Sequence, residues 1–339
     1  MAVNQSPEYT KAEEKYRAAT TADERLRCLE EMLRLVPKHK ASEKLQSQLK
    51  QKIKAAREEG QQEHKHAGGH RDIFAVPRQG AGQVVLLGEP NVGKSAILAA
   101  LTDAKVEVAD FPFSTHTAIP GMAYHEDVPI QLVDMPPLID GEPQPGMVNT
   151  YRLADVILLV IDLSAVDLLD QYERPLRMLL ERNLRPVSTS VPPMPEGDPP
   201  VQPKRVLVVA NKSDTPQAAE NFEGLTELCA GMKDLGADGL RMLPISAVTR
   251  DGLDEMMSLL FDLLNVIRVY AKKPGKPADL LAPFILPQGS TVLDLARHIH
   301  RELAEHLKIA RIWGGAVHDG QQVHHTHVLT DRNVLELHF

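Results

Sequence analysis

The octapeptide Gly88-Glu-Pro-Asn-Val-Gly-Lys-Ser95 constrains this chain more than any other stretch. It follows an apolar run, Val84–Leu87, and precedes a helix-like run, Ala96–Leu101. A strand, a glycine-containing loop and a helix in this order are the context in which GxxxxGK[ST] predicts a phosphate-binding P-loop. The two glycines allow the backbone amides to turn toward an anion, and the helix adds the positive end of its dipole. A chance glycine turn does not explain this combination.

The loop predicts a set of contacts to a nucleotide. The ammonium of Lys94 is expected to reach the β- and γ-phosphates, and the hydroxyl of Ser95 is expected to bind Mg²⁺. The apolar run Ile130–Val133 ends in Asp134, which is placed to hold the Mg²⁺ shell through water. The predicted nucleotide-binding residues of the loop are Gly88, Glu89, Pro90, Asn91, Val92, Gly93, Lys94, Ser95 and Ala96.

A second group of residues predicts that the base is guanine. The run Val206–Ala210 ends in Asn211-Lys-Ser-Asp214, and Asp214 is placed to accept hydrogen bonds from guanine N1–H and the exocyclic amine. Asn211 is expected to brace the site, and the stem of Lys212 to cover the base. The backbone amides of Ser246 and Ala247 are expected to donate to guanine O6. The order and spacing of these motifs after the P-loop indicate GTP, whereas each fragment alone is weak.

Apolar runs alternate with helix-like segments across the middle of the chain. Two of these runs flank the polar turn His125-Glu126-Asp127 and predict a hairpin. Nearly continuous apolar strands between helices predict an α/β fold with a mostly parallel sheet covered on both faces. A proline-rich stretch between Arg185 and Lys204 is expected to form an exposed loop. The predicted strands are Val84–Leu87, Met122–Tyr124, Ile130–Val133, Val156–Ile161, Val206–Ala210 and Met242–Ile245, and the helices include Gln171–Glu181 and Asn221–Met232.

Three regions are expected along the chain. Residues 1–66 form an N-terminal helical region and linker, and residues 67–272 form the P-loop domain. Residues 273–339 form a small α+β unit, whose first residues belong to a linker at Lys272–Pro277. Within this unit we expect one helix at Val292–Leu307 and strands at Phe284–Leu286, Ile309–Trp313, Val323–His325 and Val334–His338.

The N-terminal region contains a basic segment. Eight Lys or Arg residues lie between Arg34 and Arg57 against a single acid, Glu43. They form either a helical arm that contacts RNA phosphates or a solvated helix face opposite an apolar stripe. His64, His66 and His70 in the linker, and the eight irregularly spaced histidines from His298 to His338, are not expected to bind a metal.

Composition excludes several classes of protein. The net charge of −8 gives no global attraction to nucleic acid, so an RNA contact needs a local patch. Two cysteines, Cys28 and Cys229, are too few for a disulfide framework and favour a reducing compartment, hence a cytoplasmic location. No run approaches the ~20 apolar residues of a membrane span, so no membrane partner is expected.

The motifs resemble those of one protein family. Phe113-Ser-Thr115, Ile119-Pro-Gly121 and the P-loop resemble the Obg-like and DRG (developmentally regulated GTP-binding) GTPases. The tail, with Thr291–Asp294 and Leu335–His338 among its motifs, resembles a TGS domain, which is a β-grasp module. The resemblance covers about residues 70–339. It implies a GTPase with ribosome- or RNA-associated partners and Mg²⁺ as cofactor, with Thr115 as the switch I ligand of the ion and Lys94, Thr115 and Asn91 as catalytic residues.

The sequence departs from the family pattern in switch II. Asp134-Met-Pro-Pro137 replaces Asp-x-x-Gly, and proline has no N–H to donate to a γ-phosphate. Leu138 occupies the position where Ras-like enzymes carry a glutamine that orients water. Neither the inserted domain of DRG proteins nor the glycine-rich domain of Obg is evident. Slow hydrolysis and weak discrimination between GTP and GDP are therefore expected, with Thr115 sensing most of the difference.

Two functions remain open. Related GTPases with asparagine at the position of Asn91 bind K⁺, so Asn91 is either a K⁺ ligand or a residue that only fixes the loop. The first function is a slow K⁺-stimulated GTPase switch that acts on ribosomal or RNA partners through the TGS domain and the basic helices. The second is a scaffold that hydrolyses little or no GTP and signals by GTP/GDP occupancy. ATP use, known in one Obg-related branch, is disfavoured by Asn211 and Asp214.

Overall fold

The computed structural model describes Met32, Leu35 and residues 73–102, 117–188, 201–232, 235, 239–280, 282–315 and 317–338. The chain divides into two units, Met1–Asp72 and Ile73–Phe339. In the first unit the description covers Met32, which is buried, and Leu35, both in helical conformation. The lysines and arginines of the predicted basic segment, the linker histidines and the predicted switch I residue Thr115 lie outside the described residues.

The second unit begins with a seven-stranded sheet of order β2-β3-β1-β4-β6-β5, in which β7 also pairs with β6. Strand β2 is antiparallel to β3, and the other pairs are parallel. The predicted α/β fold with a mostly parallel sheet is confirmed. The strands are β1 (Gln83–Leu87), β2 (Ile119–His125), β3 (Val128–Asp134), β4 (Val156–Asp162), β5 (Leu184–Val187), β6 (Gln202–Asn211) and β7 (Met242–Pro244).

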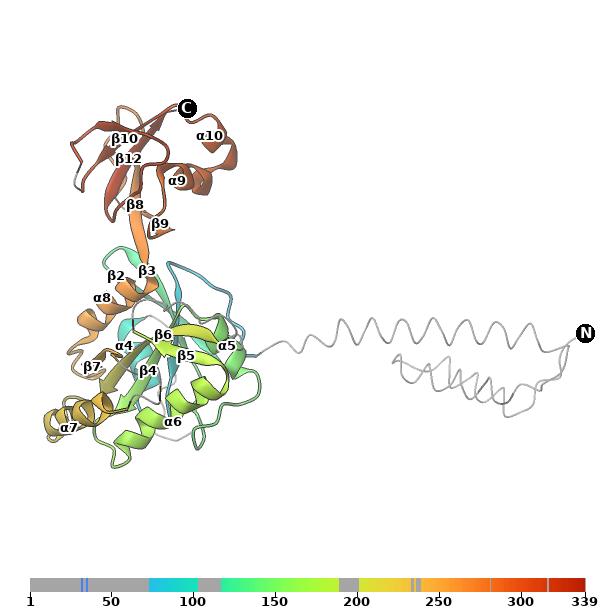
Figure 1. Ribbon diagram of the computed structural model, residues 1–339, viewed down its shortest axis with the longest axis vertical. Helices are drawn as coiled ribbons and strands as arrows, with labels where there is room; N and C mark the ends of the chain where they lie inside the picture. Colours follow the sequence, from blue (N-terminus) through green and yellow to red (C-terminus); the bar gives the residue numbers. More distant parts are fainter. Residues whose placement is uncertain are drawn as a thin grey trace, which may run out of the picture. The chain divides into compact units, whose positions relative to one another are not determined.

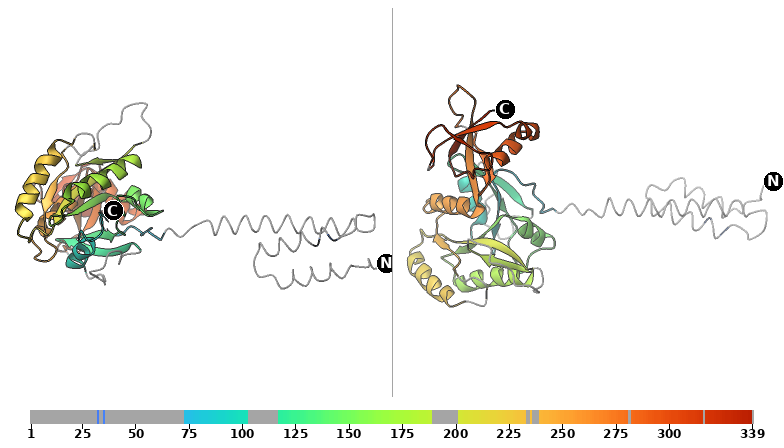
Figure 2. Two further views of the ribbon diagram at one scale, coloured as in Figure 1. Left: turned by 90° about the horizontal axis from the view of Figure 1, so that it is seen from below. Right: turned by 45° about the horizontal axis from the view of Figure 1, so that its top comes forward.

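Helices cover both faces of this sheet (Figures 1 and 2). Helices α4 (Lys94–Leu101) and α8 (Leu253–Leu264) pack on one face, against the inward side chains of β1, β3 and β4. Helices α5 (Met147–Leu153), α6 (Leu168–Glu181) and α7 (Ala218–Ala230) pack on the other face. Apolar side chains on both sides explain why the central strands are apolar without alternation. Within the described residues no helix is long and apolar enough to cross a membrane.

Strand β5 was not predicted. It lies at the start of the proline-rich stretch, and residues 189–200 of that stretch lie outside the described residues. Arg185 of β5 pairs in parallel with Pro203 at the start of β6. A proline is tolerated at a strand start, where a missing N–H breaks no central ladder bond.

The C-terminal sheet has the order β11-β10-β12-β8-β9 and packs on helix α9. Thr291 and Asp294 form a reciprocal capping box that starts α9. The predicted single helix is two helices, because His300 is extended (φ −165°) between them. The elements are β8 (Val266–Lys272), β9 (Phe284–Pro287), α9 (Val292–Ile299), α10 (Arg301–Glu305), β10 (Ile309–Trp313), β11 (Gln321–Val323) and β12 (Asn333–His338).

Strand β8 enters the C-terminal sheet directly from α8. Asn265, the C-cap of α8, adopts a left-handed conformation (φ 58°) that turns the chain into β8. Strand β8 then pairs in parallel with β12 and antiparallel with β9. The predicted boundary between residues 272 and 273 follows this strand, whereas the C-terminal sheet already includes Val266–Lys272. No proline or glycine marks this entry, which explains why the sequence placed the boundary later.

Candidate nucleotide-binding site

The carboxyl ends of the parallel strands gather the predicted motifs at one edge of the sheet. Strand β1 leads into Gly88, β3 ends in Asp134 and β6 ends in Asn211. In the strand register Leu86 pairs with Asp134, and Ala210 pairs with Pro244, two residues before Ser246. In open α/β sheets, ligands bind outside the carboxyl ends of the strands.

The shape of the loop depends on its two glycines. Gly93 is left-handed (φ 94°) at the start of α4, and a Cβ there would lie 2.1 Å from Nδ2 of Asn211. A Cβ on Gly88 would lie 2.5 Å from the carbonyl oxygen of Val160. Asn91 is also left-handed (φ 61°) and exposed. The loop therefore passes too close to its neighbours for a side chain at either glycine.

Lys94 lies folded over the loop. Its ammonium donates to the carbonyl oxygens of Gly88 (3.0 Å) and Glu89 (2.9 Å) and is buried. Burial lowers the pKa of this ammonium to about 8, although the charges of Asp134 and Glu89 oppose the shift. Two carbonyl oxygens are modest partners for a buried cation, so an anion in the loop would improve the surroundings of Lys94.

Ser95 and Asp134 place two hard oxygen donors together. The hydroxyl of Ser95 donates to Oδ2 of Asp134 at 2.5 Å, and Asp134 is fully buried. Hydroxyl and carboxylate oxygens beside a phosphate site are a donor set that suits Mg²⁺, which keeps several waters and uses few protein ligands. In the part of the chain that the structure describes, no three His, Cys, Asp or Glu side chains are grouped so that they could hold a metal.

Asn211 connects the phosphate loop to the segment after β7. Its Nδ2 donates to the carbonyl oxygen of Val92 (3.0 Å), and its Oδ1 accepts the amide of Ala247 (3.1 Å). Ser246 donates its hydroxyl to Oδ1 of Asp214 at 2.6 Å. Asp214 is otherwise exposed. Asn211 thus bridges the phosphate loop and the segment that carries Ala247.

The amides expected to face guanine O6 have partners inside the protein. The amide of Ser246 donates to the carbonyl of Asp251 (3.0 Å), and that of Ala247 donates to Asn211. A base oxygen at this position would therefore have to share or replace the contact between Ala247 and Asn211.

One residue of the site was missed in the sequence. Asp162 ends β4 and accepts a hydrogen bond from Nζ of Lys212 at 2.5 Å, which fixes the stem of that left-handed lysine (φ 65°). The run Val156–Ile161 before Asp162 was the available signal, because Asp134 follows β3 in the same way. The pairing holds the Lys212 stem in one place over the edge of the sheet.

The switch II segment from Met135 to Leu138 is buried. The amide of Leu138 donates to the carbonyl oxygen of Gly88 at 3.1 Å, and its side chain packs in the core with Met135 and Tyr151. Pro137 contributes no donor. Leu138 thus contacts the P-loop through its backbone and the core through its side chain.

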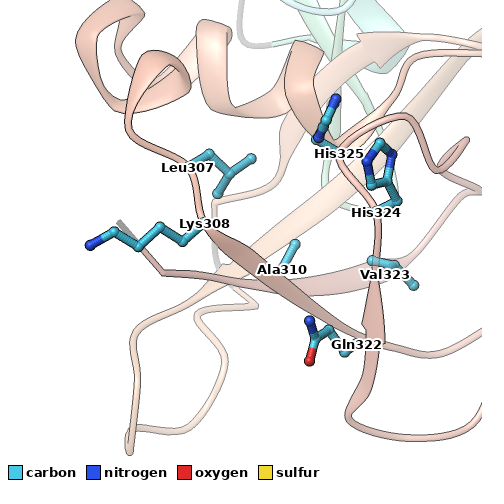
Figure 3. A pocket seen from close by; sticks show the side chains of 7 residues that line it. All are labelled: Leu307, Lys308, Ala310, Gln322, Val323, His324 and His325. Carbon is cyan, nitrogen blue, oxygen red and sulfur yellow. The ribbon is translucent and has the colours of Figure 1, made fainter.

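A separate cavity of about 290 Å³ lies in the C-terminal domain (Figure 3). Its imidazoles, His324 and His325, have ring centroids 3.8 Å apart, whereas Lys308 extends away from them. Its side chains do not converge on one point. The lining residues are Leu307, Lys308, Ala310, Gln322, Val323, His324 and His325.

Two parts of the chain match known protein families. Residues 83–191 match a family described as 50S ribosome-binding GTPase, and residues 267–338 match the TGS domain. Developmentally-regulated G-protein 1 of Arabidopsis thaliana is 27% identical over 360 residues, which cover 93% of this chain and 90% of that protein. This chain is a TGS-bearing relative of the developmentally regulated GTP-binding proteins. The resemblance predicted from its motifs is confirmed.

Two further comparisons concern an archaeal protein and a solved structure. An uncharacterized GTP-binding protein of Methanocaldococcus jannaschii is 28% identical to this chain over 369 residues, which cover 93% of this chain and 92% of that protein. A variant of Era from Aquifex aeolicus, bound to GDP and aluminium fluoride, aligns with 24% identity and a TM-score of 0.41. That alignment covers 69% of this chain and 74% of the Era chain.

Proposed function

We propose that this chain binds GTP and GDP at the carboxyl edge of the β1–β7 sheet and hydrolyses GTP slowly. The observation that carries the proposal is the double hydrogen bond of Asn211, which joins the phosphate loop at Val92 to the base segment at Ala247. A phosphate site and a guanine-reading carboxylate, Asp214, are thereby held as one unit. Single-turnover hydrolysis of GTP, measured beside GDP affinity, tests both parts of the proposal.

Base and phosphate are recognised by different groups. Asp214, oriented by the hydroxyl of Ser246, accepts from guanine N1–H and the exocyclic amine. The stem of Lys212, held by Asp162, covers one face of the base. Lys94 exchanges its two carbonyl partners for phosphate oxygens, which are stronger acceptors. Adenine offers no matching pair of donors to Asp214.

Hydrolysis proceeds by in-line attack of water on the γ-phosphate. Ser95, Asp134 and Thr115 are the residues that would hold Mg²⁺, which when bound supplies positive charge beside the phosphate oxygens. Lys94 adds its charge to the equatorial oxygens as they become more negative. Leu138 is buried and apolar, so it orients no water, and the intrinsic rate is low. We assign sensing of the γ-phosphate mainly to Thr115, because Pro137 has no backbone N–H to donate.

Potassium is expected to accelerate hydrolysis by about tenfold or more over sodium, well below the ~10³–10⁵ of an arginine finger. A cation held by Asn91 would stabilise charge that develops in the transition state. Asn91→Ala should remove the difference between KCl and NaCl while leaving GDP affinity nearly unchanged. Single-turnover rates in the two salts provide the measurement.

Asn183→Ala is the matched control for this experiment. Asn183 is also exposed and left-handed (φ 59°), but it lies between α6 and β5, away from the loop. It should keep the full potassium effect. Equal rates in both salts for the wild type would remove Asn91 from the cation site. Binding of GTP without measurable hydrolysis would instead favour the scaffold, which signals by occupancy alone.

The affinity for GDP is expected to be constant below pH ~8 and to fall above it by up to about tenfold per pH unit. The pKa of Lys94 is about 8 in the structure, and a bound phosphate would raise it. Below the lower of these two pKa values, Lys94 is protonated in both the free and the nucleotide-bound protein. Above it, Lys94 of the free protein loses its proton, and the protein must take up a proton when it binds GDP. Calorimetry in buffers of different ionisation enthalpy measures that uptake. Lys94→Met should bind weakly at every pH, whereas a wild-type affinity unchanged up to pH 10 would contradict this role.

The partner that we propose is a ribosomal or RNA-containing assembly in the cytoplasm. Two observations support it: the family description matched by residues 83–191 and the basic segment from Arg34 to Arg57. Charge reversal at Lys50, Lys52 and Lys54 should reduce co-sedimentation with ribosomal subunits, most visibly at low salt. Truncation after Asn265 removes the whole C-terminal sheet and should, independently of the charge reversal, reduce co-sedimentation with ribosomal subunits. Co-sedimentation that survives both changes would place the partner surface elsewhere.

A further inference from the structure

The β2–β3 hairpin runs from the nucleotide site to the C-terminal domain. At one end Ile119 pairs with Asp134, which contacts Ser95 of the P-loop helix. At the other end, beyond the pair His125–Val128, the chain turns through Glu126 and Asp127. Glu126 is left-handed there (φ 54°), as tight hairpin turns require. One end of the hairpin therefore lies at the nucleotide site, and the other end contacts the C-terminal sheet.

Both carboxylates at the turn contact side chains of the C-terminal sheet. Arg268 of β8 bonds to Oδ1 of Asp127 at 2.7 Å and also pairs with Glu126. Tyr270, two residues along β8, donates its hydroxyl to Oδ2 of Asp127 at 2.5 Å. Arg332, the residue before β12, donates to Glu126 at 2.6 and 2.8 Å. These hydrogen bonds lower the pKa of Glu126, so its charge persists in mildly acidic solution.

Arg268 depends on the hairpin for its charge balance. Its side chain is only 4% exposed, and its third carboxylate partner, Asp331, accepts from Nε at 3.1 Å. A buried guanidinium is costly unless it is paired and hydrogen-bonded. Two of its three carboxylate partners come from the hairpin and one from its own domain. A shift of the turn would therefore change the surroundings of a buried charge.

Strand β2 also lies against α4, the helix that begins at the P-loop. Strand β2 pairs only with β3 among the described strands, so it is an edge strand. At Gly121 it passes so close to α4 that a Cβ would lie 2.7 Å from Oγ1 of Thr102 and 2.8 Å from the side chain of Leu98. Helix α4 begins at Lys94 and carries Ser95. Movement of the P-loop helix would reach β2 by contact.

We propose that the Glu126–Asp127 turn, clamped by Arg268, couples the nucleotide at the P-loop to the attachment of the TGS domain. GTP and GDP place the hairpin differently, which changes how tightly the turn holds Arg268. By thermodynamic reciprocity the clamp in turn changes the relative affinities of GTP and GDP. This inference rests on the proposed binding of both nucleotides, and it adds that the TGS domain reports which nucleotide is bound.

The experiment uses the full chain and a double variant, Glu126→Gln with Asp127→Asn, which removes both charges but keeps the shape of the turn. Calorimetry gives the affinities for GDP and a non-hydrolysable GTP analogue, and hydrogen exchange of the β8 amides reports on the clamp. In the wild type, β8 exchange should differ about fivefold or more between the two nucleotides. The double variant should lose that difference and shift the affinity ratio by a similar factor.

Two further variants serve as a control and as a partial loss of the contacts to Glu126. Arg297→Ala removes an exposed arginine whose ion pair among the described residues, with Asp294 at 3.5 Å, lies within its own helix, and this variant should behave as wild type. Arg332→Ala removes one exposed partner of Glu126 and should give an intermediate shift even if the double variant unfolds. Identical β8 exchange with both nucleotides in the wild type, or unchanged affinity ratios in Arg332→Ala and the double variant, would overturn the coupling alone. A wild type that binds neither nucleotide would overturn the proposed function as well.

Discussion

Replacing Asp214 with asparagine is expected to lower GDP affinity by about 10²–10⁴ and to make xanthosine diphosphate the better ligand. The carboxylate accepts two hydrogen bonds from guanine, and a hydrogen bond to a charged group is worth about 1.5–3 kcal/mol. Asparagine retains one acceptor, which the Ser246 hydroxyl already contacts at 2.6 Å. Its amide nitrogen then faces the base and suits the carbonyl that xanthine carries in place of the amine of guanine.

Calorimetry with guanosine, xanthosine and adenosine diphosphates measures this exchange. Asp254→Asn is the control, because Asp254 is an exposed aspartate in the first turn of α8 and should leave all three affinities unchanged. Wild-type protein that binds ADP as tightly as GDP would contradict the role of Asp214. So would a variant that still prefers GDP.

Gly93→Ala is expected to destabilise the protein by about 3 kcal/mol or more and to reduce nucleotide affinity by at least ~10². The left-handed backbone (φ 94°) disfavours alanine, and its methyl group would lie 2.1 Å from Nδ2 of Asn211. Asn211 would have to move, and with it the bonds to Val92 and Ala247 that join the two recognition segments. One methyl group thus affects the phosphate site and the base site together.

Gly224→Ala separates this effect from the general consequence of replacing a glycine. Gly224 lies within α7, and a Cβ there meets nothing within 4 Å. Alanine should stabilise that helix by up to about 1 kcal/mol, because glycine is the poorer helix former by that amount. Denaturant unfolding measures both variants. Similar stability and affinity in the two would mean that the close approach at Gly93 is not a constraint on the site.

Six of the seven strands of the P-loop sheet could be predicted from the sequence, and β5 could not. Runs such as Val84–Leu87 and Val206–Ala210 are buried on both sides, so their composition alone marks central strands. Each recognition motif follows directly after such a run. Once the strands are parallel, their ends must meet at one edge, and the proximity of Asn211 to the P-loop follows from that geometry.

The contacts that the sequence did not reveal are those made across long separations or through atypical segments. Arg268 and Glu126 are 142 residues apart in the chain, and the sequence around either residue does not indicate that the two are in contact. Strand β5 was hidden by prolines, which usually argue against a strand. The role of Leu138 was also hidden, because its backbone and its side chain act in different places. Such features depend on tertiary packing, which no short window of sequence contains.

The central place of β12 in the C-terminal sheet has a consequence for synthesis of the chain. Strand β8 is made immediately after α8, yet its parallel partner β12 is the last described strand to emerge, and β12 also completes the pairing of β10. The described strands of the P-loop domain are all synthesised long before that moment, so this domain is free to fold first. A nascent chain therefore displays the apolar inner side of β8 until β12 has been synthesised. A message truncated before Asn333 would yield a folded P-loop domain that carries an unfinished sheet, a target for chaperones and proteases.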